Sequence, residues 1–187
     1  MTTDDIIILL LYYSKDEMIA GRTLLQKTLY FLNKKLNLGI DFSPYYYGPY
    51  SREITEELEN LKASDIICEE IKEFKPIDYH VTFEPRKYIY SLGETGAKLA
   101  EKLEERDPIL AKGIKQTLEF MRDKDATNNY KVLSIAAKMD NILESENKPM
   151  YVDEILEEAK ILGWIISKEE AQCALTLLKK LEMVDNA

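Results

Sequence analysis

The chain has 187 residues, a net charge of −9 and a hydrophobic content of 45%. This length and composition are typical of a globular protein with one large or two small domains, and they exclude a disordered chain. The acidic balance argues against simple nucleic-acid binding, because phosphate repels such a chain unless its basic residues are segregated on one face.

Three amphipathic helices are predicted in the first third of the chain, over residues 2–14, 23–39 and 51–63. The first is apolar but preceded by acidic residues and too short to span a bilayer, so we expect a cytoplasmic protein with no signal peptide and no membrane partner. In the second, Thr23 and Gln26 have the spacing of a capping box, and leucines recur every three or four residues along one face.

Three short strands are predicted next, over residues 66–68, 81–83 and 88–90. Three helices followed by a small β-ribbon predict a winged helix-turn-helix. The stretch YSLGETG, residues 90–96, supports this order, because it resembles the pattern with which winged-helix regulators leave the wing. Gly93 stands where those regulators usually have Thr.

The second half of the chain is predicted to be helical. A helix begins at Pro108, and three apolar helical faces follow it. Met183 and Val184 are expected to begin a short strand. The polar stretch 123–129 is the expected domain boundary.

The predicted fold class is therefore mostly α, or α+β. Residues 1–106 form a winged helix-like domain with a small β-wing, and residues 107–128 form a connecting helix and linker. Residues 129–187 form a C-terminal three-helix bundle with a helix-turn-helix-like turn.

No pattern in the sequence predicts an enzyme. The single histidine, His80, has no Cys, Asp or Glu spaced as metal ligands would be, and the chain has neither a phosphate-binding loop nor a serine nucleophile elbow. We expect no catalytic residue, no cofactor and no metal. Cys68 and Cys173 stand far apart in apolar surroundings and are expected to be buried, reduced thiols.

The positions of the basic residues indicate whether a winged helix in this chain could bind DNA. The third helix of this fold usually enters the major groove, but here Glu53, Glu56, Glu57 and Glu59 outnumber Arg52 and Lys62. A solvated face is one explanation for the remaining basic residues, and contact with DNA phosphates is the other. The candidate phosphate contacts are Arg22, Lys27, Lys34, Lys35, Arg86 and Lys87.

Four tyrosines surround one Gly-Pro pair in residues 42–54, FSPYYYGPYSREI. Side chains alternate in direction along an extended segment, so an inward Tyr46 would leave Tyr45 and Tyr47 outward. One interpretation is an aromatic corner that packs the second helix against the third. The other is a binding surface, because exposed aromatic rings are typical interface anchors. We expect Tyr46 and Tyr50 to pack, and Tyr45 and Tyr47 to contact a partner.

Two motifs, RTLLQKTLYFLNKKL at residues 22–36 and FSPYYYGPYSREI at residues 42–54, carry a family resemblance. Together they resemble the YwgA-like family and, more distantly, the Panacea domain of SocA-like antitoxins. The resemblance implies a non-enzymatic module that binds a protein toxin or adapts a partner for proteolysis.

Two functions therefore remain open. The first is an antitoxin-like adaptor that binds a protein partner. The alternative is a DNA-binding transcriptional regulator, which could form a homodimer through residues 108–123. The candidate residues for protein contact are Tyr45, Tyr47, Arg52, Thr55 and Glu56.

Overall fold

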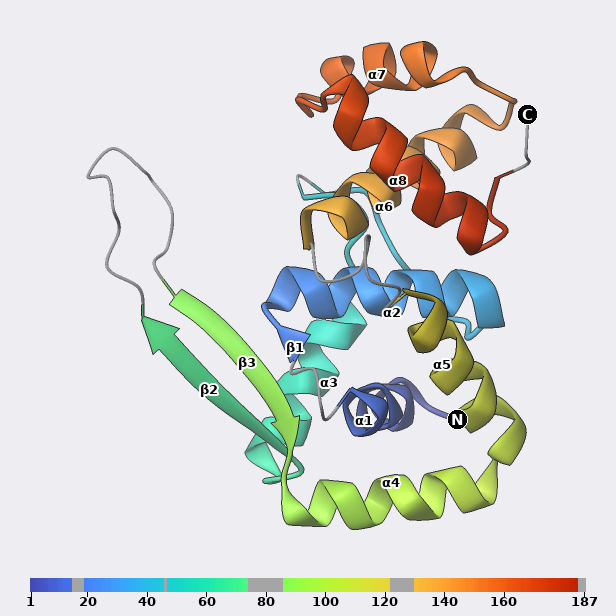
Figure 1. Cartoon of the computed structure of the whole chain (residues 1–187). Coiled ribbons are helices and arrows are strands. Elements are labelled where there is room, and N and C mark those ends of the chain that lie inside the picture. Colours follow the sequence, from blue (N-terminus) through green and yellow to red (C-terminus); the bar gives the residue numbers. More distant parts are fainter. Residues whose placement is uncertain (15–18, 46, 74–85, 122–129, 185–187) are drawn as a thin grey trace.

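The computed structural model describes residues 1–14, 19–45, 47–73, 86–121 and 130–184. Within them the chain is mostly helical with one small antiparallel sheet (Figure 1), so the predicted α+β class is confirmed. The elements are α1 (Thr3–Tyr13), β1 (Ile19–Ala20), α2 (Arg22–Leu36), α3 (Arg52–Ala63), β2 (Ile67–Glu73), β3 (Arg86–Leu92), α4 (Glu94–Arg106), α5 (Pro108–Met121), α6 (Tyr130–Glu146), α7 (Val152–Ile161) and α8 (Lys168–Lys180).

Helix α1 is the centre of the first half of the fold. Thr2 precedes it as predicted, and the Thr2 backbone N–H donates to Asp5 Oδ2 at 3.1 Å. Every residue from Ile6 to Leu11 is buried, which is the pattern of a helix enclosed on all sides. Helices α3, α4 and α5 surround it (Figure 1).

Helix α2 begins two residues earlier than its predicted capping box. Its cap is Gly21, and its last residue is followed by Asn37 in the left-handed conformation, so the predicted ends at Thr23 and Gly39 are wrong. Gln26 is buried and bonds the backbone of Ser51 twice: its Nε2 donates to the Ser51 carbonyl at 2.9 Å, and the Ser51 N–H donates to its Oε1 at 3.0 Å. These two hydrogen bonds fix the start of α3 against α2.

The sheet has the strand order β1-β3-β2. Strand β3 pairs with β2 along its length, from Ile67 opposite Leu92 to Glu73 opposite Arg86, and this hairpin extends away from the helices (Figure 1). The strands predicted at 66–68 and 88–90 are confirmed, whereas residues 81–83 lie outside the described residues. The other strand is β1, whose two residues are too few to show a period in the sequence. Met183 and Val184 form no strand.

The β3–α4 junction explains the glycines of the YSLGETG stretch. The Gly93 N–H donates to the Ile66 carbonyl at 2.9 Å, and Gly93 caps α4. A Cβ on Gly96 would lie 2.3 Å from the same carbonyl oxygen, so only glycine fits there without a shift of backbone.

Two clusters of buried side chains share α2. The first gathers around α1 and includes Ile114 and Leu118 of α5. The second lies among α6, α7 and α8, and α2 contributes Tyr30 and Phe31 to it. The C-terminal helices therefore pack on α2, more than ninety positions away in sequence (Figure 1).

Both cysteines are free, but the prediction that they are buried is wrong. Cys68 and Cys173 are exposed. Ile67 and Ala174 turn inward, so the neighbouring cysteines lie on the outward faces of β2 and α8.

The Gln26–Ser51 bonds generate a prediction for stability. Replacing Gln26 with Leu leaves the buried N–H of Ser51 without a partner and removes the shorter of two bonds to its carbonyl, so we expect a loss of about 2–4 kcal/mol in the free energy of unfolding. Chemical denaturation measures it, with Gln116→Leu on the exposed face of α5 as the control. Equal stabilities for the two variants would contradict the assigned role of Gln26.

Candidate functional site

The tyrosine loop, residues 42–50, is closed by backbone bonds at its base. Ser43 and Tyr50 each donate an N–H to the other's carbonyl at 2.9 Å. At its tip the Gly48 N–H donates to the Tyr45 carbonyl at 2.8 Å, and Gly48 has a φ of 89°, a conformation that favours glycine. Backbone bonds therefore close the loop at its base and at its tip.

The exposed positions of Tyr45 and Tyr47 are confirmed. Their side chains are 58% and 60% exposed. Tyr50 is half-buried as predicted, its ring centroid lies 5.3 Å from that of Tyr45, and its hydroxyl is 2.8 Å from Thr55 Oγ1. The prediction that Tyr46 points inward lies outside the described residues.

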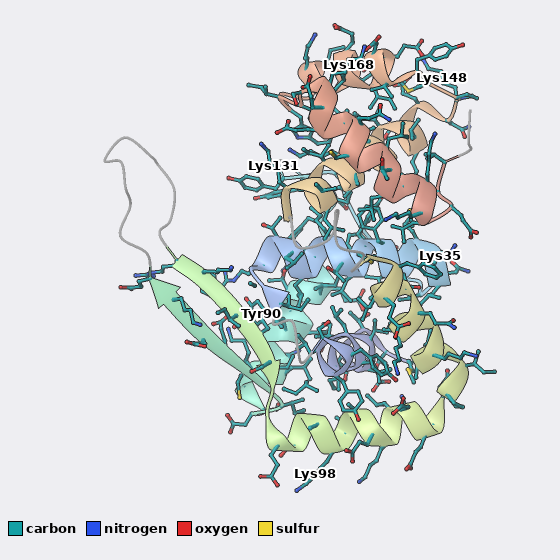
Figure 2. The ribbon with its side chains drawn as sticks, viewed as in Figure 1. Lys35, Tyr90, Lys98, Lys131, Lys148 and Lys168 are labelled. Carbon is teal, nitrogen blue, oxygen red and sulfur yellow. The ribbon has the colours of Figure 1, made fainter. Side chains whose placement is uncertain are left out.

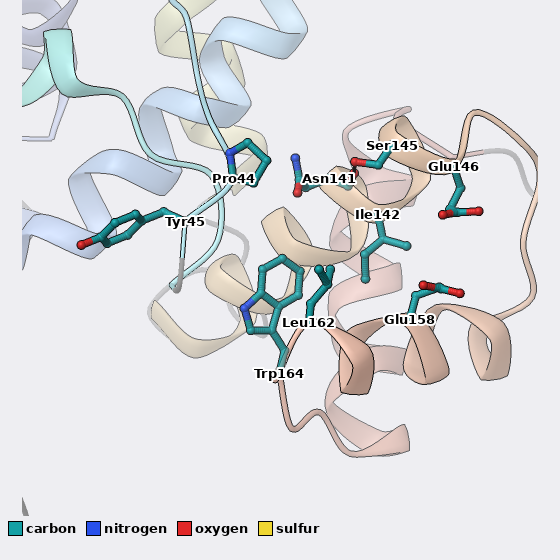
Figure 3. A pocket seen from close by; sticks show the side chains of 9 residues that line it. All are labelled: Pro44, Tyr45, Asn141, Ile142, Ser145, Glu146, Glu158, Leu162 and Trp164. Carbon is teal, nitrogen blue, oxygen red and sulfur yellow. Dashed lines mark hydrogen bonds between the residues drawn. The ribbon is translucent and has the colours of Figure 1, made fainter.

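A groove of about 540 Å³ opens between the tyrosine loop and the C-terminal helices (Figure 3). We call it the bundle groove. Pro44 and Tyr45 form its loop side, while Trp164 and Leu162 form the facing apolar side. Its lining also includes Asn141, Ile142 and Ser145 of α6, together with Glu146 and Glu158. The two glutamates face each other at the end remote from Tyr45 (Figure 3).

The turn that follows α7 contributes Leu162 and Trp164 to the groove lining and carries further exposed apolar side chains. Ile161 is 76% exposed, Leu162 51% and Ile165 99%. Trp164 between them is buried and anchors the turn on the second hydrophobic cluster. The sequence predicts this segment only as a helix-turn-helix-like turn. Its signal was the run of apolar residues directly after Gly163 that no helical face uses.

A second cavity, of about 220 Å³, lies between α2, α3 and the tyrosine loop. We call it the tyrosine pocket. Tyr45, Tyr47 and Tyr50 line it together with Lys27 of α2, which is 2% exposed. The Lys27 ammonium donates to the Pro49 carbonyl. Burial, with repulsion from Lys138, lowers the pKa of Lys27 to about 8.

A polar network joins α2 to α6 beside the groove. The Tyr30 hydroxyl donates to Asp140 Oδ2 at 2.6 Å, and Lys34 Nζ lies 3.2 Å from the same oxygen. Asp140 is 4% exposed, and burial raises its pKa above the ordinary value. Lys34 also pairs with Glu144. The network holds α6, and with it one wall of the groove, on α2.

The predicted basic face of α2 is largely occupied by internal contacts. Lys27 is buried, Lys34 pairs with α6, and Lys35 donates to Glu182 Oε2 at 2.5 Å near the end of α8 (Figure 2). These contacts compete with DNA phosphates for the three lysines, whose role as phosphate contacts stays a prediction. The acidic partners of Lys34 and Lys35 lie more than a hundred positions away in sequence, so the fold places acidic side chains beside the basic residues of α2.

The other predicted phosphate contacts are more exposed. Arg22 lies over the Tyr88 ring at 4.2 Å, and its Nε donates to the Tyr90 hydroxyl at 3.3 Å. Arg86 lies 3.6 Å from Glu73 on the hairpin. Lys87 is exposed on the same strand.

The predicted partner-contact residues on α3 differ in exposure. Arg52 and Glu56 are exposed and pair with each other at 2.6 Å. Thr55 is half-buried and accepts a bond from Gln26 Nε2 at 3.1 Å, so it packs the α2–α3 junction beneath the tyrosine pocket.

Comparison of the chain with protein-family models and with curated proteins finds no match. Across the described part of the chain, no helix has the length and apolar character needed to cross a membrane. The same residues include no group of three or more His, Cys, Asp or Glu side chains arranged to hold a metal ion.

The Tyr30–Asp140 bond gives a second stability prediction. Tyr30→Phe removes one hydrogen bond to a buried carboxylate, and we expect it to lower the free energy of unfolding by about 2 kcal/mol. Tyr151→Phe, at a side chain that is 82% exposed, is the matched control. If Tyr30→Phe proves as stable as the control in thermal and chemical denaturation, the network does not hold α6 on α2.

The lowered pKa of Lys27 predicts a pH dependence of stability. The unfolded chain binds the Lys27 proton more tightly than the folded chain, so stability rises with pH through the window between the two pKa values. From about pH 7 to about pH 9.5 the free energy of unfolding should increase by about 2 kcal/mol more in the unmodified chain than in Lys27→Met.

Urea denaturation across this pH series measures the difference. Lys112→Met, at an exposed lysine of α5, is the control and should follow the unmodified chain. Identical pH slopes for the unmodified chain and Lys27→Met would contradict a buried, charged Lys27.

Proposed function

We propose that the chain is a non-enzymatic adaptor that binds a protein partner across the tyrosine loop and the bundle groove. The observation that carries the proposal is a groove with an exposed aromatic side chain on one side and an exposed apolar side chain on the other. Tyr45 and Leu162 line it, and the exposed side chains of Tyr47 and Ile165 lie close to them in sequence. Exposed apolar surface beside a concave groove is typical of protein interaction sites, and tyrosine is among the residues that dominate their binding energy.

We further propose a winged helix-turn-helix scaffold for residues 1–106. The element order α1-β1-α2-α3-β2-β3 and the strand order β1-β3-β2 support it. In such a scaffold α3 would be the DNA-reading helix, but its exposed side chains include Glu53, Glu56 and Glu59. The acidic character of α3 favours a winged-helix scaffold that binds protein in place of DNA. The antitoxin-like family that the motifs resemble binds protein in this way.

Capture experiments test the proposed interface. The tagged full chain should retain a specific protein from an extract of its source organism. Tyr45→Ala and Leu162→Asp should each weaken its purified complex about tenfold or more, because each removes an exposed anchor. Tyr151→Ala is the control, since Tyr151 is equally aromatic and exposed but lies outside the groove. Affinities that neither change alters would refute this interface.

DNA binding is the competing function, and the winged-helix order is the observation that favours it. We expect no gel shift with mixed-sequence duplex DNA at moderate salt, because α3 is acidic and Lys34 and Lys35 are paired internally. Charge reversal of Arg86 and Lys87 is the informative change, since it leaves the α2–α6 contacts intact. A salt-dependent shift that this reversal abolishes would replace the adaptor function with a regulator.

A further inference from the structure

The tyrosine pocket holds a positive charge that the described part of the chain does not balance. Lys27 is buried, and its ammonium group has three N–H donors. The acceptor found for them is the Pro49 carbonyl, which is neutral. A buried ammonium group without an anionic partner is costly, and this cost is the reason that buried charges are usually paired.

A second lysine increases the positive potential at the same place. Gly48 lies between the two side chains: a Cβ at Gly48 would be 3.5 Å from Lys27 Nζ and 3.1 Å from Cγ of Lys138. Lys138 lies over the Trp164 ring at 5.1 Å and forms no ion pair with a described acidic residue. Burial lowers the pKa of Lys138 as well.

The acidic side chains near the tyrosine pocket bind other lysines. Asp140 on α6 is bonded to Tyr30 and Lys34. Glu59 lines the pocket, but its carboxylate binds Lys62 at 2.9 Å. The α2–α6 junction therefore pairs Lys34 with acidic side chains, and among the described residues Lys27 and Lys138 have no acidic partner.

We propose that the tyrosine pocket binds a carboxylate group carried by a side chain of the protein partner. The proposal rests on the adaptor function above, because the pocket shares Tyr45 with the bundle groove. Lys27 supplies a charge-assisted hydrogen bond at the floor of the pocket, and Lys138 adds a longer-range attraction. The rings of Tyr45 and Tyr47 form walls at the mouth, where they contact the aliphatic part of a Glu or Asp side chain.

Nuclear magnetic resonance of the lysine side chains tests this in the unmodified full chain. The probes are a short peptide with blocked ends and one central Glu, its Gln counterpart, sodium acetate, inorganic phosphate and sodium chloride. We expect the Glu peptide to shift the Lys27 Nζ and Cε signals in a saturable way and to bind at least about tenfold more tightly than the Gln peptide. Acetate should give the same shift more weakly, and chloride should give none at equal ionic strength.

Substitutions test whether the Glu peptide binds in the tyrosine pocket. Lys27→Met should abolish the binding of the Glu peptide, and Lys138→Met should weaken it roughly threefold. Lys112→Met should leave it unchanged. Should Lys27→Met fail to fold, the Lys27 signals of the unmodified chain and the Lys138→Met variant still decide the question.

Three outcomes overturn the proposal. Unchanged Lys27 signals with the Glu peptide exclude a carboxylate at the pocket. Acetate that binds as tightly as the Glu peptide assigns the pocket to a free small acid, and tighter binding of phosphate assigns it to a phosphate group. If the Glu peptide is inert while capture still depends on Tyr45 and Leu162, this inference fails and the adaptor function stands. If it binds but capture is insensitive to both residues, the adaptor interface fails.

Discussion

The structure depends on α2 having two occupied faces. One face packs on the first hydrophobic cluster around α1 and, through Gln26, bonds the backbone at the start of α3. The other face supplies Tyr30 and Phe31 to the cluster of the C-terminal helices. A shift of α2 would therefore move the tyrosine loop and one wall of the bundle groove together, since both lie against this helix.

The packing of α2 between two clusters also explains the role of its basic residues in an acidic chain. The lysines of α2 do not form a phosphate-binding face, because Asp140, Glu144 and Glu182 bind two of them from the C-terminal part of the chain. Surface left for recognition is aromatic and apolar around the loop and acidic along α3. Lys27 is the exception, since its charge is buried beneath the tyrosines without an acidic partner in the described residues.

The sequence predicted those features that depend on local periodicity. Helices 2–14, 51–63 and the C-terminal stripes have apolar residues at helical spacing, and all of them form helices. The exposure of Tyr45 and Tyr47 was predicted from alternation along an extended segment, whereas a turn closed by the Gly48–Tyr45 backbone bond lies there. Features that depend on distant partners were missed or misassigned: the two-residue strand β1, the pairing of Lys34 with Asp140, and Gln26, which matched a capping box but bonds Ser51. The exposed turn around Ile165 was missed because its neighbour Trp164 fixes it by tertiary packing.

Site-specific photocrosslinking in extracts of the source organism tests whether the tyrosine loop contacts a protein partner. A photoreactive amino acid is placed at Tyr47 in the tyrosine loop, and in a second protein at Ile109 on α5, which is 85% exposed and outside the loop and groove. We expect one discrete protein adduct from position 47 and none of the same mass from position 109. Adducts with nucleic acid alone from position 47, or the same protein adduct from both positions, would contradict it.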